Sequence, residues 1–192
     1  MLGQDEMAAR RALGAARRAH ATRVAAEETA LMLVPHAGYP VALEALRVLG
    51  DAWPGRARRT REGTASGWRR RGEALCRRVY GRVYPRLMRN LQRLHPDMRA
   101  WVIEDGYGRV LSRPGLSAAT RELLAVAVLA ASGWERQLVS HLRGGRQAGI
   151  GRAELQQALA CGTAGAPPRT IRAATRAWSL AFDVAARAGR DG

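Results

Sequence analysis

The stretch RELLAVAVLAASGWERQLVSHLRGG, residues 121–145, contains the pattern that decides the fold. Its nine consecutive apolar residues, Leu123 to Ala131, predict a helix that is apolar on every side. Such a helix must be buried, either inside a bundle or in a subunit interface. The Ser132-Gly133 pair indicates a turn, and apolar residues then recur at helical spacing over residues 134–148. We therefore expect a helical hairpin.

Two polar residues interrupt this apolar hairpin. Glu122 lies about ten residues before the turn and His141 about eight after it, which places them within roughly 3 Å of the same height on antiparallel helices. They could share a hydrogen bond or face one small pocket, an arrangement that is frequent at catalytic sites. Alternatively, Glu122 bonds to an arginine such as Arg121 or Arg143, and His141 is a core histidine with its bonds satisfied. The spacing leaves both interpretations open.

Helical periodicity extends over nearly the whole chain. Pro85 should kink or split the helix in which it falls. No segment has the pattern of a strand, so we expect an all-α fold. The helices expected outside the hairpin cover residues 5–20, 27–34, 41–49, 79–94, 96–110, 152–160 and 169–188.

Residues 51–72 differ from the rest of the chain. They contain four glycines, one proline and seven arginines against two acids, with almost no periodicity. We interpret this segment as an Arg/Gly-rich linker or mobile loop, and we assign no ligand to it.

The composition is that of a globular protein with a strongly basic surface. The chain has 192 residues, 47% of them hydrophobic, and a formal net charge of +16 that is carried by arginine without any lysine. Such a surface attracts nucleic acid non-specifically at low salt. The arginines are spread over many segments, and no nucleic-acid-binding motif accompanies them. We therefore expect no specific nucleic-acid partner.

Cysteine usage and hydropathy favour a cytoplasmic protein. Cys76 and Cys161 lie far apart in the sequence and fit neither a disulfide framework nor a metal site. The longest apolar run is far shorter than the roughly 20 residues needed to cross a bilayer, so we expect no membrane partner. The N-terminal segment has early acids and no apolar core typical of a signal peptide.

The segment RPGLSAATRELLAVAVLAASGWERQLVSHLRGGRQAGIGRAELQQAL resembles the carboxymuconolactone decarboxylase family, which includes the alkylhydroperoxidase D-like proteins. The resemblance covers about residues 73–160. A second stretch, EETALMLVPHAGYPVALEALRVL at residues 27–49, is similar to the other end of the same family's unit, which in the usual order follows the histidine helix. The resemblance implies an alkylhydroperoxidase D-like helical bundle, either circularly rearranged or built from two incomplete units.

This resemblance suggests four parts of the chain. Residues 1–50 would be helices like the C-terminal half of a family unit, 51–72 the linker, 73–165 the decarboxylase-like core and 166–192 a C-terminal helix. The N-terminal part could complete a pocket in its own chain or in a neighbouring subunit. His36 and Tyr39 would then line the substrate pocket, although each could equally be a packing residue.

The family implies two chemistries. In the alkylhydroperoxidase D-like branch, a pair of cysteines lies seven and four residues before the histidine. One of them attacks peroxide as the thiolate, and the other is the resolving thiol. The corresponding positions here are Trp134 and Gln137, so that mechanism lacks its thiols. A family-level label of peroxiredoxin activity would therefore be inherited rather than supported by these residues.

The decarboxylase branch lacks those cysteines and acts on 4-carboxymuconolactone without a cofactor. The resemblance then implies that His141 transfers a proton and that Glu122 orients it or acts as a second acid/base group. Arg121 or Arg143 would anchor the substrate carboxylate. The expected cofactor set is empty, and no metal is expected.

The leading hypothesis is thus a carboxymuconolactone decarboxylase-like enzyme acting on a carboxylated lactone or a related small molecule. The alternatives are a peroxiredoxin-like antioxidant protein that uses Cys76 and Cys161, and a non-catalytic oligomeric or nucleic-acid-associated protein. The all-round apolar helix favours a homo-oligomer, and the family implies a trimer or hexamer.

Overall fold

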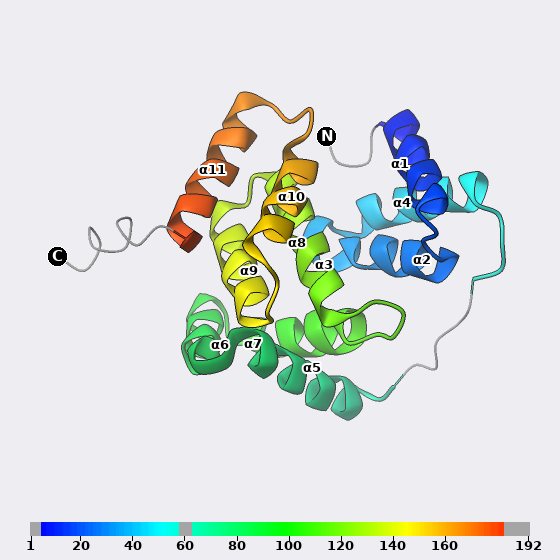
Figure 1. Ribbon diagram of the computed structural model, residues 1–192. Coiled ribbons are helices and arrows are strands. Elements are labelled where there is room, and N and C mark those ends of the chain that lie inside the picture. Colours follow the sequence, from blue (N-terminus) through cyan, green and yellow to red (C-terminus); the bar gives the residue numbers. More distant parts are fainter. Residues whose placement is uncertain (1–4, 58–62, 183–192) are drawn as a thin grey trace. The chain divides into compact units, whose positions relative to one another are not determined.

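The computed structural model describes residues 5–57 and 63–182, and helices account for nearly all of them without a strand (Figure 1). The expected all-α fold is confirmed. The chain divides into two compact units, Met1–Ser117 and Ala118–Gly192, and each is described by itself below.

The first unit begins with four helices, in which α1, α2 and α3 each pack against α4. The side chains of Asp5 and Thr22 accept hydrogen bonds from backbone N–H groups in the first turns of α1 and α2 and so cap these helices. Gly38, at a φ of +87°, separates α3 from α4. The bounds are α1 Glu6–Arg18, α2 Arg23–Leu31, α3 Leu33–Ala37 and α4 Tyr39–Ala52.

The rest of the first unit is also helical. The split expected at Pro85 is confirmed, because α5 ends at Tyr80 and α6 begins at Tyr84. The helical region expected over residues 96–110 is divided between a short α-helix and a π-helical segment. The bounds are α5 Ala65–Tyr80, η1 Gly81–Val83, α6 Tyr84–Leu94, α7 Met98–Trp101 and η2 Val102–Leu111.

The linker expected over residues 51–72 is wrong for its second part, because residues 65–72 form the first half of α5. Gly72 of α5 and Gly108 of η2 permit close packing of these two elements. A Cβ atom on Gly72 would lie 2.0 Å from the carbonyl oxygen of Ile103, and one on Gly108 would lie 2.1 Å from that of Trp68. Gly72, one of the glycines that suggested a loop, therefore allows two backbones to approach each other. Residues 58–62 lie outside the described ranges.

The second unit consists of α8 Ala118–Ser132, α9 Glu135–Gln147, α10 Arg152–Thr163 and α11 Pro168–Phe182. None of the nine apolar residues of α8 is exposed, as expected from its composition. The core joins all four helices, and Val126, Leu138 and Leu155 are completely buried in it. The helix expected over residues 169–188 matches α11 as far as Phe182, and its last six residues lie outside the described ranges.

The turn between α8 and α9 has a defined geometry. The N–H of Trp134 donates to the carbonyl of Leu129, and the N–H of Gly133 donates to that of Ala130. These two bonds form a Schellman motif, in which Gly133 adopts a φ of +71°. The motif ends α8 at a fixed residue and thereby sets the register of the hairpin.

Candidate active site

The helical hairpin brings Glu122 and His141 together. Nδ1–H of His141 donates a hydrogen bond to the Oε2 atom of the Glu122 carboxylate at 2.9 Å. Both residues are buried, with exposed fractions of 4% for Glu122 and 9% for His141. Of the two interpretations that the spacing left open, the structure shows the direct hydrogen bond between Glu122 and His141.

This contact determines the tautomer of a neutral His141 imidazole. A carboxylate can only accept a hydrogen bond, so the proton of a neutral His141 resides on Nδ1 and Nε2 is the basic nitrogen. Leu138 and Leu142, which flank His141 in α9, are completely buried. A charged carboxylate in such surroundings is stable only with a polar partner, and the imidazole supplies it.

The two candidate arginines lie differently with respect to this pair. Arg121, in α8, is buried, with 3% of its surface exposed. Arg143, in α9, is exposed, and its Nη2 atom donates to the carbonyl oxygen of Leu180 at 2.7 Å. The alternative in which Arg143 holds Glu122 is therefore not observed, because each group bonds elsewhere.

His36 and Tyr39 belong to the first unit, whereas Glu122 and His141 belong to the second. The Nδ1–H of His36 donates to the carbonyl of Met32 at 2.8 Å, one turn earlier in the chain. Tyr39 is the first residue of α4 and is 65% exposed. The expectation that these two residues line a substrate pocket stays a prediction.

The cysteines do not form a thiol pair. Cys76 is buried in α5 of the first unit, and Cys161 is exposed in α10 of the second. Within the described residues, no group of three or more His, Cys, Asp and Glu side chains is arranged to hold a metal ion.

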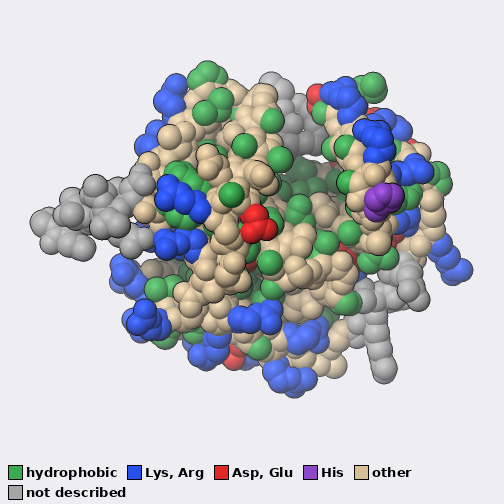
Figure 2. All heavy atoms as spheres, in the orientation of Figure 1, with side chains coloured by type: hydrophobic (Ala, Val, Ile, Leu, Met, Phe, Trp, Pro, Cys, Tyr) green, Lys and Arg blue, Asp and Glu red, His purple; other side chains and the backbone are tan. Residues whose placement is uncertain are grey.

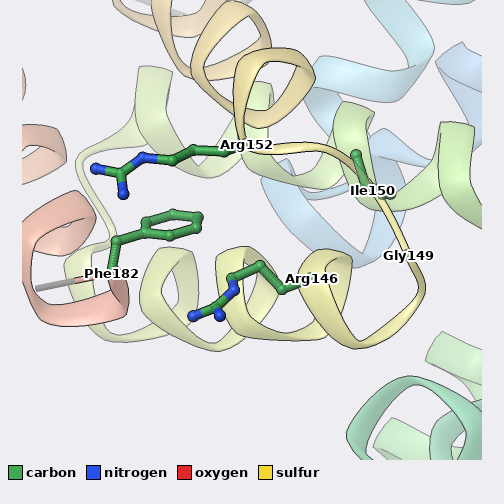
Figure 3. Close-up of a pocket in the computed structure, with 5 residues that line it drawn as sticks. All are labelled: Arg146, Gly149, Ile150, Arg152 and Phe182. Carbon is green, nitrogen blue, oxygen red and sulfur yellow. The ribbon is translucent and has the colours of Figure 1, made fainter. Parts of the chain in front are cut away.

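The arginines do not gather on one surface in the view of Figure 2, where they are scattered among apolar and neutral side chains. Two of them, however, line a cavity in the second unit together with Phe182 (Figure 3). Sequence reasoning missed this cavity because Phe182 lies some thirty residues beyond the other lining residues. Glu122 and His141 do not line it.

Comparison with known proteins gives a match to one family over part of the chain. Residues 96–186 match the sequence model of the carboxymuconolactone decarboxylase family, and the expected resemblance to this family is confirmed. The match starts and ends later than the range of 73–160 expected from the sequence, and it includes both Glu122 and His141.

One relative is a 4-carboxymuconolactone decarboxylase from Acinetobacter baylyi, which is 36% identical over 74 residues. The aligned region is 38% of this chain and 55% of the relative, so the chain spans about half the length of the curated protein that it matches. No solved structure gives a significant match. None of the helices in the described ranges is long and apolar enough to cross a membrane.

Proposed function

We propose that this protein is a cofactor-free acid/base enzyme that decarboxylates a carboxylated lactone or a related small molecule. The observation that carries the proposal is the buried hydrogen bond between His141 and Glu122. The family match and the name of the Acinetobacter relative support the choice of reaction.

The reaction needs little beyond proton transfer and charge stabilisation. The bond between the carboxylate carbon and the ring carbon breaks, carbon dioxide leaves, and the electron pair passes into the unsaturated lactone. A proton must then be returned to carbon. His141, once protonated at Nε2, donates that proton and regains one from water, while Glu122 stabilises the imidazolium and holds its orientation.

Arg121 is the better candidate for the carboxylate anchor. Residues two apart on a helix point in nearly opposite directions, so Arg143 lies on the far side of α9 from His141. Arg121 is about 100° around α8 from Glu122. Its burial strengthens the attraction between a guanidinium and an anion relative to the same pair in water.

The test is the ultraviolet-monitored loss of 4-carboxymuconolactone with the purified protein. His141→Ala and Glu122→Gln should both lose turnover while retaining their circular dichroism spectrum. His95→Ala and Glu135→Gln are matched controls. The side chain of His95 is 57% exposed and that of Glu135 is 31% exposed, so both substitutions should leave turnover unchanged. Absence of turnover by the parent protein would exclude this substrate. Full turnover in both folded site variants would exclude the proposed site.

We also propose that the protein forms a homo-oligomer. In the second unit, Trp134 and Ile171 are large apolar residues with exposed fractions of 59% and 44%. Apolar surface of this kind often marks contacts between subunits. Light scattering coupled to size-exclusion chromatography measures the assembly, and a mass of 20.9 kDa at all concentrations would contradict the proposal.

A further inference from the structure

The second unit contains a cavity of about 330 Å³ that the proposed reaction does not use. It forms where the last turn of α9, the first turn of α10 and the end of α11 approach one another (Figure 3). Its lining consists of Arg146, Gly149, Ile150, Arg152 and Phe182.

The two arginines are held in place by aromatic rings. The Cζ atoms of Arg146 and Arg152 lie 5.3 and 5.1 Å from the centroid of the Phe182 ring, which is seen between the two guanidinium groups in Figure 3. Arg152 also lies 5.4 Å from the ring of Trp178, which packs against Phe182 at a centroid distance of 4.2 Å. Cation–π contacts use the faces of the guanidinium groups and leave their N–H edges to bind a ligand.

The charge of these arginines is not balanced by the described side chains around them. Within residues 5–57 and 63–182, neither Arg146 nor Arg152 forms an ion pair with a carboxylate. The nearest acid in sequence, Glu154, accepts a hydrogen bond from the N–H of Gly151 at 3.0 Å and caps α10. The described lining therefore carries positive charge, which favours an anion.

The apolar part of the lining restricts the kind of anion. Phe182 offers a flat, half-buried ring, and Ile150 supplies a buried aliphatic surface beside it. A guanidinium edge binds a carboxylate through two parallel hydrogen bonds, while the flat ring favours a flat ligand body. The volume is at the lower end of that found for small-molecule sites, which indicates a small ligand.

We propose that this cavity binds a small planar carboxylate, one with an aromatic or conjugated body, between Arg146 and Arg152. The site is distinct from the Glu122–His141 pair. Its existence does not rest on the proposed function, because it is tested by binding and not by turnover.

The experiment is isothermal titration calorimetry of the full-length protein with phthalate at 0.15 M salt. The saturated cyclohexane analogue of phthalate has the same two carboxylates on a body that is not flat. Inorganic phosphate supplies charge without any apolar body. We expect saturable binding of phthalate at one site per chain, with weaker binding of both other anions.

Three variants locate the site. Arg146→Gln and Arg152→Gln should each weaken phthalate binding about ten-fold, the effect of losing one hydrogen-bonded charge. Phe182→Leu should reduce the preference for phthalate over its saturated analogue. Arg136→Gln is the control, because Arg136 is an exposed residue of α9 about 15 Å along the helix from Arg146, beyond the screening length of about 8 Å.

Each outcome decides the proposal. A ten-fold loss in the two cavity variants, with a change of less than two-fold in Arg136→Gln, supports it. Equal losses in all three arginine variants would show attraction to net charge only and would overturn it. Equal binding of phthalate and phosphate would overturn the assignment of a planar ligand. The absence of saturable binding by the parent protein would overturn the site itself.

Discussion

Each compact unit contains a buried glutamate that is bonded to a basic side chain, but the basic side chains differ. In the first unit, Glu28 of α2 is 5% exposed and accepts hydrogen bonds from Nε and Nη2 of Arg113 at 2.9 to 3.1 Å. In the second unit, Glu122 of α8 is 4% exposed and accepts one hydrogen bond from His141.

The guanidinium and the imidazole give the two pairs different roles. An arginine stays protonated at every pH at which a protein is folded, so the Glu28–Arg113 pair is a fixed ion pair that ties α2 to the end of the unit. An imidazole can both accept and donate a proton, and on this ground we propose that the Glu122–His141 pair takes part in acid/base reactions. Burial of a carboxylate alone therefore does not identify an active site.

In both units, a glycine allows a helix to pack closely against the backbone of another helix. In the first, α5 approaches η2 through Gly72, and in the second, α10 approaches α8 through Gly162, where a Cβ would lie 2.1 Å from the carbonyl oxygen of Ala127. Both are backbone contacts that no rotamer change can relieve. The units are thus alike in how their helices pack and differ in what their buried glutamates can do.

The largest expected effect separates the two glutamates by activity. If 4-carboxymuconolactone is a substrate, Glu122→Gln should lower kcat by about 10²-fold or more, because the neutral amide no longer stabilises the imidazolium. Glu28→Gln should leave kcat within two-fold at a temperature where the variant is folded. Steady-state kinetics measures both. Equal losses of kcat would mean that the buried carboxylates are equivalent and that the comparison is wrong.

The next effect concerns the glycine contacts. Gly162→Ala and Gly72→Ala should each lower the free energy of unfolding by about 3 kcal/mol, because a methyl group must displace backbone. Gly50→Ala is the matched control, since Gly50 lies within α4 and its Cβ would meet open space. That substitution should stabilise the protein by about 0.5 to 1 kcal/mol through helix propensity. Urea denaturation followed by circular dichroism measures all three.

A loss of less than 0.5 kcal/mol in Gly72→Ala would contradict the close approach of α5 and η2. The same result would restore the interpretation of residues 65–72 as part of a loop. Gly162→Ala serves the same purpose for α8 and α10.

The two glutamates should also differ in stability, by a smaller amount. Glu28→Gln should lower the free energy of unfolding by about 2 kcal/mol, because Arg113 would keep its charge without the carboxylate. Glu122→Gln should cost only about 1 kcal/mol, since the amide oxygen can still accept the Nδ1–H bond of a neutral His141. Thermal and urea unfolding at pH 8 give both values. A larger loss for Glu122→Gln would indicate that His141 is charged in the folded protein at that pH.

The sequence was sufficient to predict the all-α fold, and it offered the contact between Glu122 and His141 as one of two interpretations. The hairpin has a short turn at Ser132-Gly133, so counting residues from that turn shows which side chains lie at the same height but not whether they bond. The Glu28–Arg113 pair could not be predicted in this way. Its partners are 85 residues apart, and a chain with this many arginines offers many possible partners for any buried acid.

The failure at residues 65–72 has a related cause. A glycine within a segment without apolar periodicity has the same local signature in a loop and in a closely packed helix. The contact that distinguishes them, between Gly72 and Ile103, lies about thirty residues away in the chain. The cavity around Phe182 was missed for the same reason. Local sequence patterns therefore predicted most of the helices. The helical start of α5 and the cavity depend on contacts between residues far apart in the chain, which local patterns do not contain.

The smallest expected effect comes from a cluster of carboxylates that are ion-paired like Glu28 but exposed. This cluster tests whether ion pairing without burial contributes to stability. Arg47 of α4 binds the carboxylates of Glu44 and, in α1, of Glu6, and its Nη1 atom lies 3.0 Å from Asp51. Its hydrogen bonds hold the pKa of Glu6 and that of Glu44 below the ordinary value of 4.5. Groups with lowered pKa values stabilise the folded state above the ordinary value, and this contribution is lost as the pH falls below 4.5.

Arg47→Gln should therefore lower the melting temperature slightly at pH 7, and the difference from the parent protein should shrink at pH 3. Because these side chains are well exposed, solvent screens the interaction, and the loss at pH 7 should be smaller than that of Glu28→Gln. Differential scanning calorimetry at the two pH values measures both quantities. A difference that is the same at pH 7 and pH 3 would assign the effect to packing of the Arg47 side chain. A loss equal to that of Glu28→Gln would show that pairing, and not burial, determines how much each carboxylate contributes to stability.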